Sequence, residues 1–172
     1  MKQQDSIFEV KPGKEFADMG KRPRPEHPRP QLMRDSWESL NGIWEFAFDF
    51  SNSGIENGFP ETEEAPLRII VPFCPESPLS GIGYTDFIPA VWYRRSFQIT
   101  PEKIRGCILL HFGAVDYECS VWINGKSAGT HKGGYTSFSF DISELVTEGE
   151  NTVVVYAEDD IQSGKQCSGK QS

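Results

Sequence analysis

Acidic side chains are the residues of this sequence best suited to chemistry, and two of them stand out because they are adjacent. Asp159 and Asp160 follow the apolar run TVVVYAE, which predicts a strand. The end of a strand can hold a carboxylate rigidly at the edge of a cleft. Neighbouring aspartates are also ordinary turn residues. The pair therefore indicates either a polar binding site or a turn.

No pair of catalytic carboxylates is evident among the other acids. Two carboxylates that act together must face each other across the substrate, whereas these acids fall in loops or singly at strand ends, where solvated charges are common. The histidines His27, His111 and His131 lie far apart, and no GxSxG elbow accompanies them. We expect His111 to be a hydrogen-bonded strand histidine.

The composition excludes several classes of partner. The 172 residues carry a formal net charge of -8, so a nucleic-acid partner is not expected, because phosphate binding needs a basic face. The four cysteines have no metal-ligand spacing, and we expect no cofactor and no metal in this chain alone. Cys107 and Cys119 lie in predicted strands and are expected to be reduced core residues.

Neither a signal peptide nor a membrane span is predicted. The sequence starts MKQQDSIFEV, which has no basic and apolar leader, and no later run is long and apolar enough to cross a bilayer. These features predict a cytoplasmic protein without a membrane partner.

An all-β fold is predicted from residue 42 onward. Short β-branched and aromatic runs alternate with Gly, Pro, Asn and Asp, which is typical of a sandwich or barrel. The expected strands are 43–50, 68–73, 91–99, 107–112, 118–124, 137–142 and 151–158. Asn124-Gly125 predicts a type I′ turn, which makes 118–132 a hairpin.

Three regions are expected along the chain. Residues 1–41 predict an extended N-terminal strap, residues 42–160 the β-sandwich, and residues 161–172 a flexible tail. Within the sandwich, the acidic stretch 52–66 predicts a surface loop.

The aromatic residues divide into core and surface candidates. Trp44, Trp92 and Trp122 lie inside predicted strands, where packing is the usual role of an aromatic ring. Tyr135 follows Gly133-Gly134 in a predicted loop and is the better candidate for stacking on a sugar.

Four segments in order resemble one known family. They are RPRPEHPRPQLMRDSWESLNGIWEFAFD (22–49), VPFCPESPLSGIGYTDFIPAVWYRRSF (71–97), LLHFGAVDYECSVWINGKSAGTHKGGYTSFSFDIS (109–143) and ENTVVVYAEDD (150–160). Together they resemble the N-terminal sugar-binding domain of family 2 glycoside hydrolases, of the β-galactosidase type. The resemblance implies a jelly-roll-like β-sandwich, similar to galactose-binding domains, and covers most of the chain.

In that family the sandwich precedes an immunoglobulin-like domain and a barrel that carries both catalytic glutamates. The acid/base glutamate follows an asparagine there, and no Asn-Glu dipeptide occurs in this sequence. The resemblance therefore implies a non-catalytic domain of a retaining exo-β-glycosidase, most simply a β-galactosidase acting on terminal β-galactosides. The sequence stops after SGKQS, before the strand that closes the domain in the family, so we expect a fragment.

The resemblance also implies which residues reach the neighbouring active site. Asp160, with Asp159 as the alternative, matches an aspartate that helps to hold a sugar hydroxyl and a nearby cation in the β-galactosidase branch, so Asp160 is a possible metal contact only in the full enzyme. Ser77 stands where that branch has a galactose-contacting asparagine, and its side chain is shorter than that of asparagine. Glu76 is the other candidate at this rim.

Two other functions stay open. The same architecture serves free-standing carbohydrate-binding modules. An interaction protein without a sugar role is compatible with the acidic charge and with exposed strand edges. A missing closing strand also predicts a homo-oligomer formed through an exposed strand edge.

Overall fold

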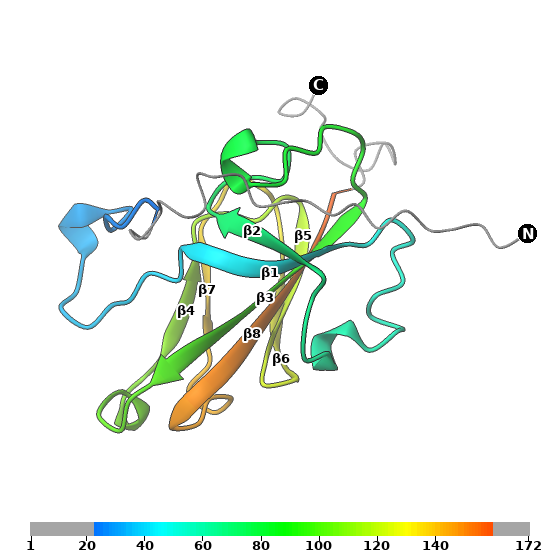
Figure 1. The fold of residues 1–172 in the computed structure, drawn as a ribbon. Helices are drawn as coiled ribbons and strands as arrows, with labels where there is room; N and C mark the ends of the chain where they lie inside the picture. Colours follow the sequence, from blue (N-terminus) through cyan, green and yellow to red (C-terminus); the bar gives the residue numbers. More distant parts are fainter. Residues whose placement is uncertain (1–22, 160–172) are drawn as a thin grey trace, which may run out of the picture. The chain divides into compact units, whose positions relative to one another are not determined.

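The computed structural model describes residues 23–159, which divide into two compact units. The smaller unit comprises residues 23–43 and 67–85, and the larger unit comprises residues 44–66 and 86–159. Almost all regular structure is β, as the sequence predicts, and the helical elements are single 3-10 turns (Figure 1). Within residues 23–159, no helix has the length and hydrophobicity of a membrane span.

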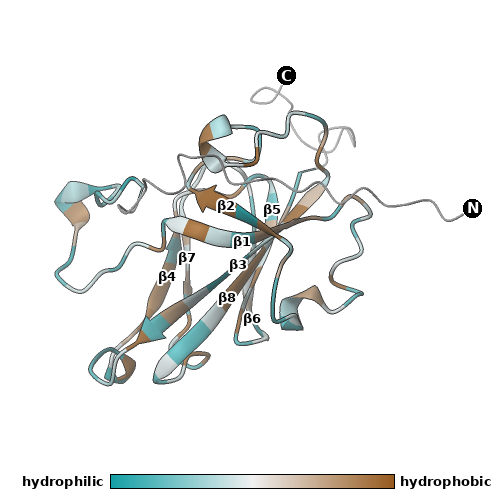
Figure 2. Ribbon diagram, viewed as in Figure 1, coloured by the Kyte–Doolittle hydropathy of each residue, from teal (hydrophilic) through white to brown (hydrophobic). Residues whose placement is uncertain are grey.

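Five strands of the larger unit form one antiparallel sheet. In spatial order they are β1 (Gly42–Phe48), β3 (Ala90–Ile99), β8 (Gly149–Glu158), β5 (Glu118–Ile123) and β6 (Lys126–Lys132). Strand β8 is central and apolar on both faces from Val153 to Ala157, because it is covered on both sides. The hydrophobic stretches lie along these strands (Figure 2).

The hairpin predicted for 118–132 is confirmed. Strands β5 and β6 pair through the register Glu118 to Lys132 and Ile123 to Lys126. Asn124 and Gly125 have φ values of 51° and 76°. Both are positive, as a type I′ turn requires.

A second sheet of two strands, β4 (Leu109–Phe112) and β7 (Phe138–Asp141), packs on one face of the large sheet. The His131 ring stacks on Phe138 with centroids 3.9 Å apart. A Cβ atom at Gly129 would approach the Phe140 ring within 2.5 Å, so only glycine fits there. We call this side of the large sheet the sandwich face; its buried residues include Phe46, Val121, Val153 and Val155.

The opposite side of the large sheet, the cover face, is shielded by residues 49–66, the cover segment. Here Ala47, Trp92, Val154 and Tyr156 form a small core with Ala65, and Phe59 and Trp122 pack against it. The Phe59 and Trp92 rings stack with centroids 4.6 Å apart. The stretch predicted as a surface loop therefore contributes buried residues to a second core.

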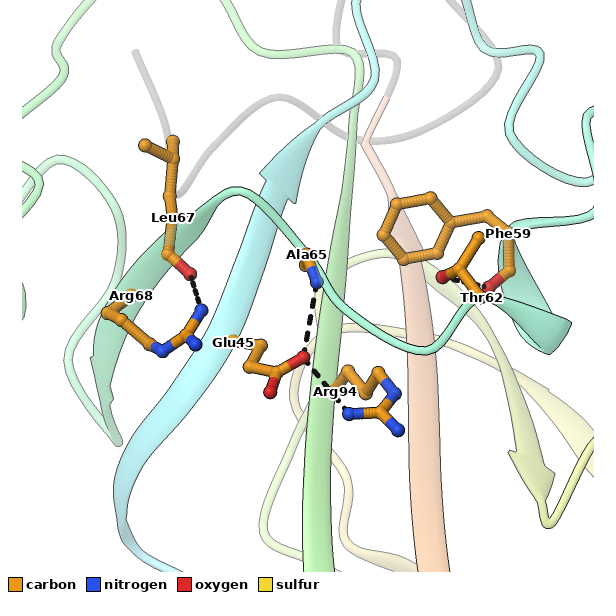
Figure 3. Close-up of polar contacts among 7 residues, drawn as sticks. All are labelled: Glu45, Phe59, Thr62, Ala65, Leu67, Arg68 and Arg94. Carbon is orange, nitrogen blue, oxygen red and sulfur yellow. Dashed lines mark hydrogen bonds and ion pairs between the residues drawn. The ribbon is translucent and has the colours of Figure 1, made fainter. Parts of the chain in front are cut away.

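Glu45 fixes the far end of the cover segment (Figure 3). Its Oε2 accepts the Ala65 N–H at 3.1 Å and Arg94 Nη1 at 3.1 Å. Glu45 and Arg94 are register partners on β1 and β3, and their side chains are only 21% and 15% exposed. One partly buried carboxylate thus joins two strands to the cover segment.

The smaller unit contains the 3-10 turns η2 (Pro30–Leu32) and η4 (Pro78–Ser80) and the strand β2 (Leu67–Val71). Asn41 Nδ2 donates to the Arg24 carbonyl at 3.1 Å, and the His27 ring meets Trp37 edge-on at 4.7 Å. These contacts hold the Pro-rich stretch to the residues before β1.

Three expectations about single residues can be compared with the structure. Cys119 is buried and burial raises the pKa of its thiol to about 11, in keeping with an inert core cysteine. Cys107 is exposed, and its assignment to the core is wrong because β4 begins only at Leu109. His111 is confirmed as a hydrogen-bonded strand histidine, since its Nδ1 contacts the Ser139 hydroxyl.

Candidate functional site

Polar side chains gather at one rim of the large sheet. Strand β1 ends at this rim and β3 begins there, since Phe48 lies opposite Val91. Strand β8 also ends there, because Glu158 is paired with both Ala90 and Glu118. We define the polar rim by the carboxylates at these strand ends and one lysine: Asp49, Asp116, Glu118, Glu158, Asp159 and Lys132.

Asp49 is a carboxylate of the polar rim that several hydrogen bonds hold in place. Its Oδ2 accepts the Trp92 indole N–H at 3.0 Å and the Gly54 N–H at 2.8 Å, and its Oδ1 accepts the Ser53 N–H at 3.1 Å. Burial alone would raise the pKa of Asp49, but these hydrogen bonds and one from Ser51 outweigh burial and lower it. The carboxylate therefore stays charged and holds the start of the cover segment.

Gly54 is required at this point because the backbone passes close to the tryptophan. A Cβ atom there would lie 2.4 Å from Trp92 Nε1 and 2.7 Å from Asp49 Oδ2. Any side chain would displace the indole or the carboxylate, so the cover segment is fitted closely to the rim.

Tyr156 connects the cover face to the polar rim. Its hydroxyl donates to Glu158 Oε2 at 2.8 Å and also contacts the side-chain oxygen of Asn52. Burial raises the pKa of Tyr156, and so do the hydrogen bond to Glu158 and the charges of Glu158 and Asp49. The phenol is therefore a neutral donor that occupies one oxygen of Glu158.

Lys132 is the single cation of the polar rim, and it is paired. Its ammonium contacts Glu118 and lies 5.6 Å from the centroid of the Tyr117 ring. The hydrogen bond to Glu118 raises the pKa of Lys132. With this pair neutralised, the remaining carboxylates leave the rim negative.

A negative rim of this kind suits sugar hydroxyls, which donate charge-assisted hydrogen bonds to fixed carboxylates. It is not arranged as a metal centre, since residues 23–159 contain no group of three or more His, Cys, Asp or Glu side chains that could hold an ion. A general acid at neutral pH needs a carboxyl group with a raised pKa. Wherever a carboxyl pKa in the described residues departs from its ordinary value, as at Asp49 and Asp141, it is lowered.

The two aspartates predicted as a site have different positions in the structure. Asp159 is half-buried at the rim, and its N–H donates to the Pro89 carbonyl at 3.0 Å. The backbone before β3 thus fixes the end of β8. Asp160 lies outside the described residues.

The other two predicted site residues, Glu76 and Ser77, are neighbours in the smaller unit. Ser77 caps η4, since its Oγ accepts the Leu79 N–H at 3.2 Å. The buried Ser80 hydroxyl donates to the Ser77 carbonyl at 2.7 Å. Glu76 is exposed. The serine is thus fixed by its loop, and its hydroxyl keeps a donor proton for a ligand.

The sequence reading missed the network of Asp49, Asn52, Tyr156 and Glu158. The only local signal is an aspartate directly after a strand, followed by Asn-Ser-Gly, which also fits an ordinary turn. The indole that bonds to Asp49 belongs to Trp92, which is 43 residues away in the sequence. This contact becomes visible only when β1 is paired with β3.

The tryptophans and Tyr135 lie where the sequence predicts. Trp44 and Trp92 are buried, 6% and 1% exposed, and Trp122 is partly buried beside Trp92. Tyr135 is 73% exposed in the loop between β6 and β7. Tyr135 is therefore an exposed aromatic ring, as the sequence predicts.

Fold and rim together define a β-sandwich domain with fixed carboxylates at one end of its main sheet. The family model for glycosyl hydrolases family 2, sugar binding domain, matches residues 78–163. This chain belongs to that family.

Relatives and solved structures agree with this assignment. A β-glucuronidase of Paenibacillus borealis is 31% identical over 74% of this chain and 22% of its own length. A β-galactosidase of Thermoanaerobacter pseudethanolicus is 32% identical over 69% of the chain and 14% of its own length. The structure of a Ruminococcus gnavus β-glucuronidase bound to C6-substituted uronic isofagomine superposes with a TM-score of 0.66 and 27% identity, over 74% of this chain and 23% of that one. The chain spans between 11% and 22% of the length of these curated relatives and of others it matches.

Proposed function

We propose that this chain is the non-catalytic N-terminal domain of a longer family 2 enzyme, a retaining exo-β-glycosidase that removes a terminal β-linked sugar. The observation that carries the proposal is the family match together with the short span of the chain relative to its relatives. In this proposal the barrel and the immunoglobulin-like domain belong to the rest of the enzyme. The described chain adds carboxylates to the margin of a sugar site and supplies neither the nucleophile nor the acid.

The candidate contacts in the intact enzyme are Asp160 first, Asp159 as its alternative, and Ser77 with Glu76 in the smaller unit. Asp159 supports the proposal by its position, because its backbone is fixed at the polar rim and its carboxylate can accept a sugar hydroxyl. In the intact enzyme we expect Asp160→Asn to raise KM for the glycoside more than it lowers kcat. Glu56→Gln, an exposed acid of the cover segment, is the matched control and should change neither constant.

A β-glucuronide is the first candidate substrate of the intact enzyme. Most of the similar proteins carry the name β-glucuronidase, among them those of Paenibacillus borealis and Felis catus. A β-galactoside is the second candidate, and it is favoured by the charge of the polar rim. Several carboxylates and one paired lysine attract neutral hydroxyls and repel a uronate.

A second candidate function is a free-standing carbohydrate-binding module, favoured by the exposed Tyr135 ring beside the polar rim residue Lys132. Isothermal titration of the purified chain with galactose, lactose and glucuronic acid separates the two functions. The support role predicts no binding tighter than about 1 mM, whereas a module binds in the micromolar range. Micromolar binding that is lost in Tyr135→Ala would replace the proposal by the module.

The partners that follow from the proposal are a terminal β-glycoside in the intact enzyme, its remaining domains, and a second copy of the chain bound through an exposed strand edge.

A further inference from the structure

Tyr156 is a buried tyrosine whose hydroxyl lies at the polar rim. The side chain is only 5% exposed, and its ring lies beside that of Trp92 with centroids 4.8 Å apart. The hydroxyl contacts the carboxylate of Glu158 and the side-chain oxygen of Asn52. A phenylalanine would fill the same space without burying a polar group. The hydroxyl therefore acts through the two residues that it touches, one on its own strand and one in the cover segment.

The carboxylate of Glu158 receives the single proton of this hydroxyl. A phenol donates one hydrogen bond, and a bond to an ionised acceptor is stronger than one to an amide oxygen. Burial and then the hydrogen bond to Glu158 raise the pKa of Tyr156, so the phenol stays protonated at neutral pH. The bond to Glu158 Oε2, 2.8 Å long, is thus permanent under the conditions in which a glycosidase works.

Glu158 keeps its second carboxylate oxygen for a ligand. Its Oε2 is bound by Tyr156, and its Oε1 accepts no hydrogen bond from the described residues 23–159. In these residues the buried side-chain atoms that lack a partner belong to Arg94 and His131, so Oε1 is in contact with solvent there. One oxygen of the carboxylate is fixed and the other is open.

The charges around Glu158 are not those of a structural ion pair. Glu118 lies directly opposite it on β5, and like charges in opposite positions destabilise a sheet. The ammonium of Lys132 is bound to Glu118. Asp49 adds a further negative charge that acts on the same phenol. Arrangements that oppose stability are expected where a protein binds a ligand or carries out chemistry.

We infer that Tyr156 is a positioning residue of the proposed sugar site, and that Glu158, which it holds, accepts a hydroxyl group of the substrate in the intact enzyme. The inference rests on the proposed function and adds a contact directly before Asp159 and Asp160 in the sequence. The backbone of Glu158 is fixed as well, since its C=O accepts the Tyr117 N–H at 3.0 Å. A carboxylate that is already immobile binds a hydroxyl with little further loss of side-chain freedom.

Steady-state kinetics of the intact enzyme with the nitrophenyl glycoside that it hydrolyses tests both roles. Glu158→Gln removes the charge at nearly constant shape, and KM should rise about tenfold while kcat changes by less than about twofold. Tyr156→Phe removes only the hydroxyl, and KM should rise about threefold because Glu158 is present but no longer held. In the double variant KM should rise no further than in Glu158→Gln, because Tyr156 acts through Glu158.

Glu150→Gln is the matched control, because Glu150 is an exposed acid at the opposite end of β8. It should change neither constant, and far-UV circular dichroism should show that all variants keep the β fold. A lower KM for a β-glucuronide in Glu158→Gln would mean that Glu158 repels a uronate and accepts no hydroxyl. Effects that multiply in the double variant would mean that Tyr156 does not act through Glu158. Either result would overturn the inference.

Failure of the inference and failure of the proposed function give different results. An intact enzyme whose KM is the same in wild type, Glu158→Gln and Tyr156→Phe overturns the inference alone, as does a fall in kcat at constant KM. A longer protein without glycosidase activity overturns the proposed function, and the inference with it.

Discussion

The two faces of the large sheet are covered in different ways. On the sandwich face, residues such as Phe46, Val121 and Val153 are completely buried and face a second sheet through apolar contacts. On the cover face, Trp92 and Tyr156 are shielded by a loop that two carboxylates hold in place, Asp49 at its start and Glu45 at its end.

The difference lies in how stability is linked to the candidate site. Apolar burial is non-directional and scales with area, so the sandwich face stabilises the fold without fixing any polar group at the rim. Directed hydrogen bonds on the cover face also fix Asp49 and Glu158 at the polar rim. Damage to the cover face should therefore reach the rim, whereas damage to the sandwich face should change stability alone.

Replacing Trp92 should give the largest effect on the cover face. The side chain is 1% exposed, stacks on Phe59 and donates to Asp49. Trp92→Ala should lower the free energy of unfolding by about 3–5 kcal/mol, because it leaves a cavity and an unpaired carboxylate. Urea unfolding followed by circular dichroism measures this loss.

The control for Trp92 is an aromatic residue outside the core. Phe87 is 41% exposed. Phe87→Ala should change the free energy of unfolding by less than about 0.5 kcal/mol, as surface substitutions usually do. An equal loss in both variants would refute the cover-face core.

Removing the carboxylate at the far end of the cover segment should have a smaller effect. Glu45→Ala leaves the Ala65 N–H and Arg94 without their acceptor, and Arg94 Nε already has no partner in the described part of the chain. We expect a loss of about 2–3 kcal/mol in urea unfolding and faster proteolysis within residues 49–66. Glu45→Gln should lose less, because its amide oxygen can still accept the Ala65 N–H. The same cleavage rate in wild type and Glu45→Ala would show that the segment is held in another way.

Asp49 should give the smallest of the three effects and a distinct pH dependence. Asp49→Asn should cost about 1–2 kcal/mol at pH 7, since a neutral amide accepts these hydrogen bonds less well. Because folding lowers the pKa of Asp49, its contribution is complete above the ordinary value of 3.8 and is lost as pH falls below that value toward the folded pKa. The difference between wild type and variant should therefore shrink on acidification.

The free energies of unfolding of wild type and Asp49→Asn, measured between pH 7 and pH 2.5, give that difference. Subtracting one free energy from the other removes the contributions of the other acids. A difference that stays constant over this range would mean that Asp49 does not hold the loop as a carboxylate.

The sequence predicted the elements whose signal is local. The apolar run of β8 and the Asn124-Gly125 turn each carry their own pattern, and both are present in the structure. Cys107 was misplaced because a four-residue strand leaves little pattern from which to locate its first residue. The cover face could not be predicted, because Phe59 and Ala65 lie in an acidic stretch and their partners Trp92 and Glu45 are distant in sequence.

The candidate site was predicted only in part, for the same reason. A pair of aspartates after a strong strand drew attention to Asp159, which lies at the polar rim. The bond between Asp49 and Trp92 depends on strand pairing and on a loop conformation that permits only glycine at position 54. No spacing rule in the sequence encodes that arrangement.

The most direct test of the account is an assay of the purified chain with nitrophenyl β-glucuronide and nitrophenyl β-galactoside. The account predicts no release of nitrophenol above the buffer rate, because in the proposed function the nucleophile and the acid belong to the rest of the enzyme. Hydrolysis that follows the chain through several purification steps and disappears in Asp159→Asn would contradict it, and would make this domain an enzyme by itself.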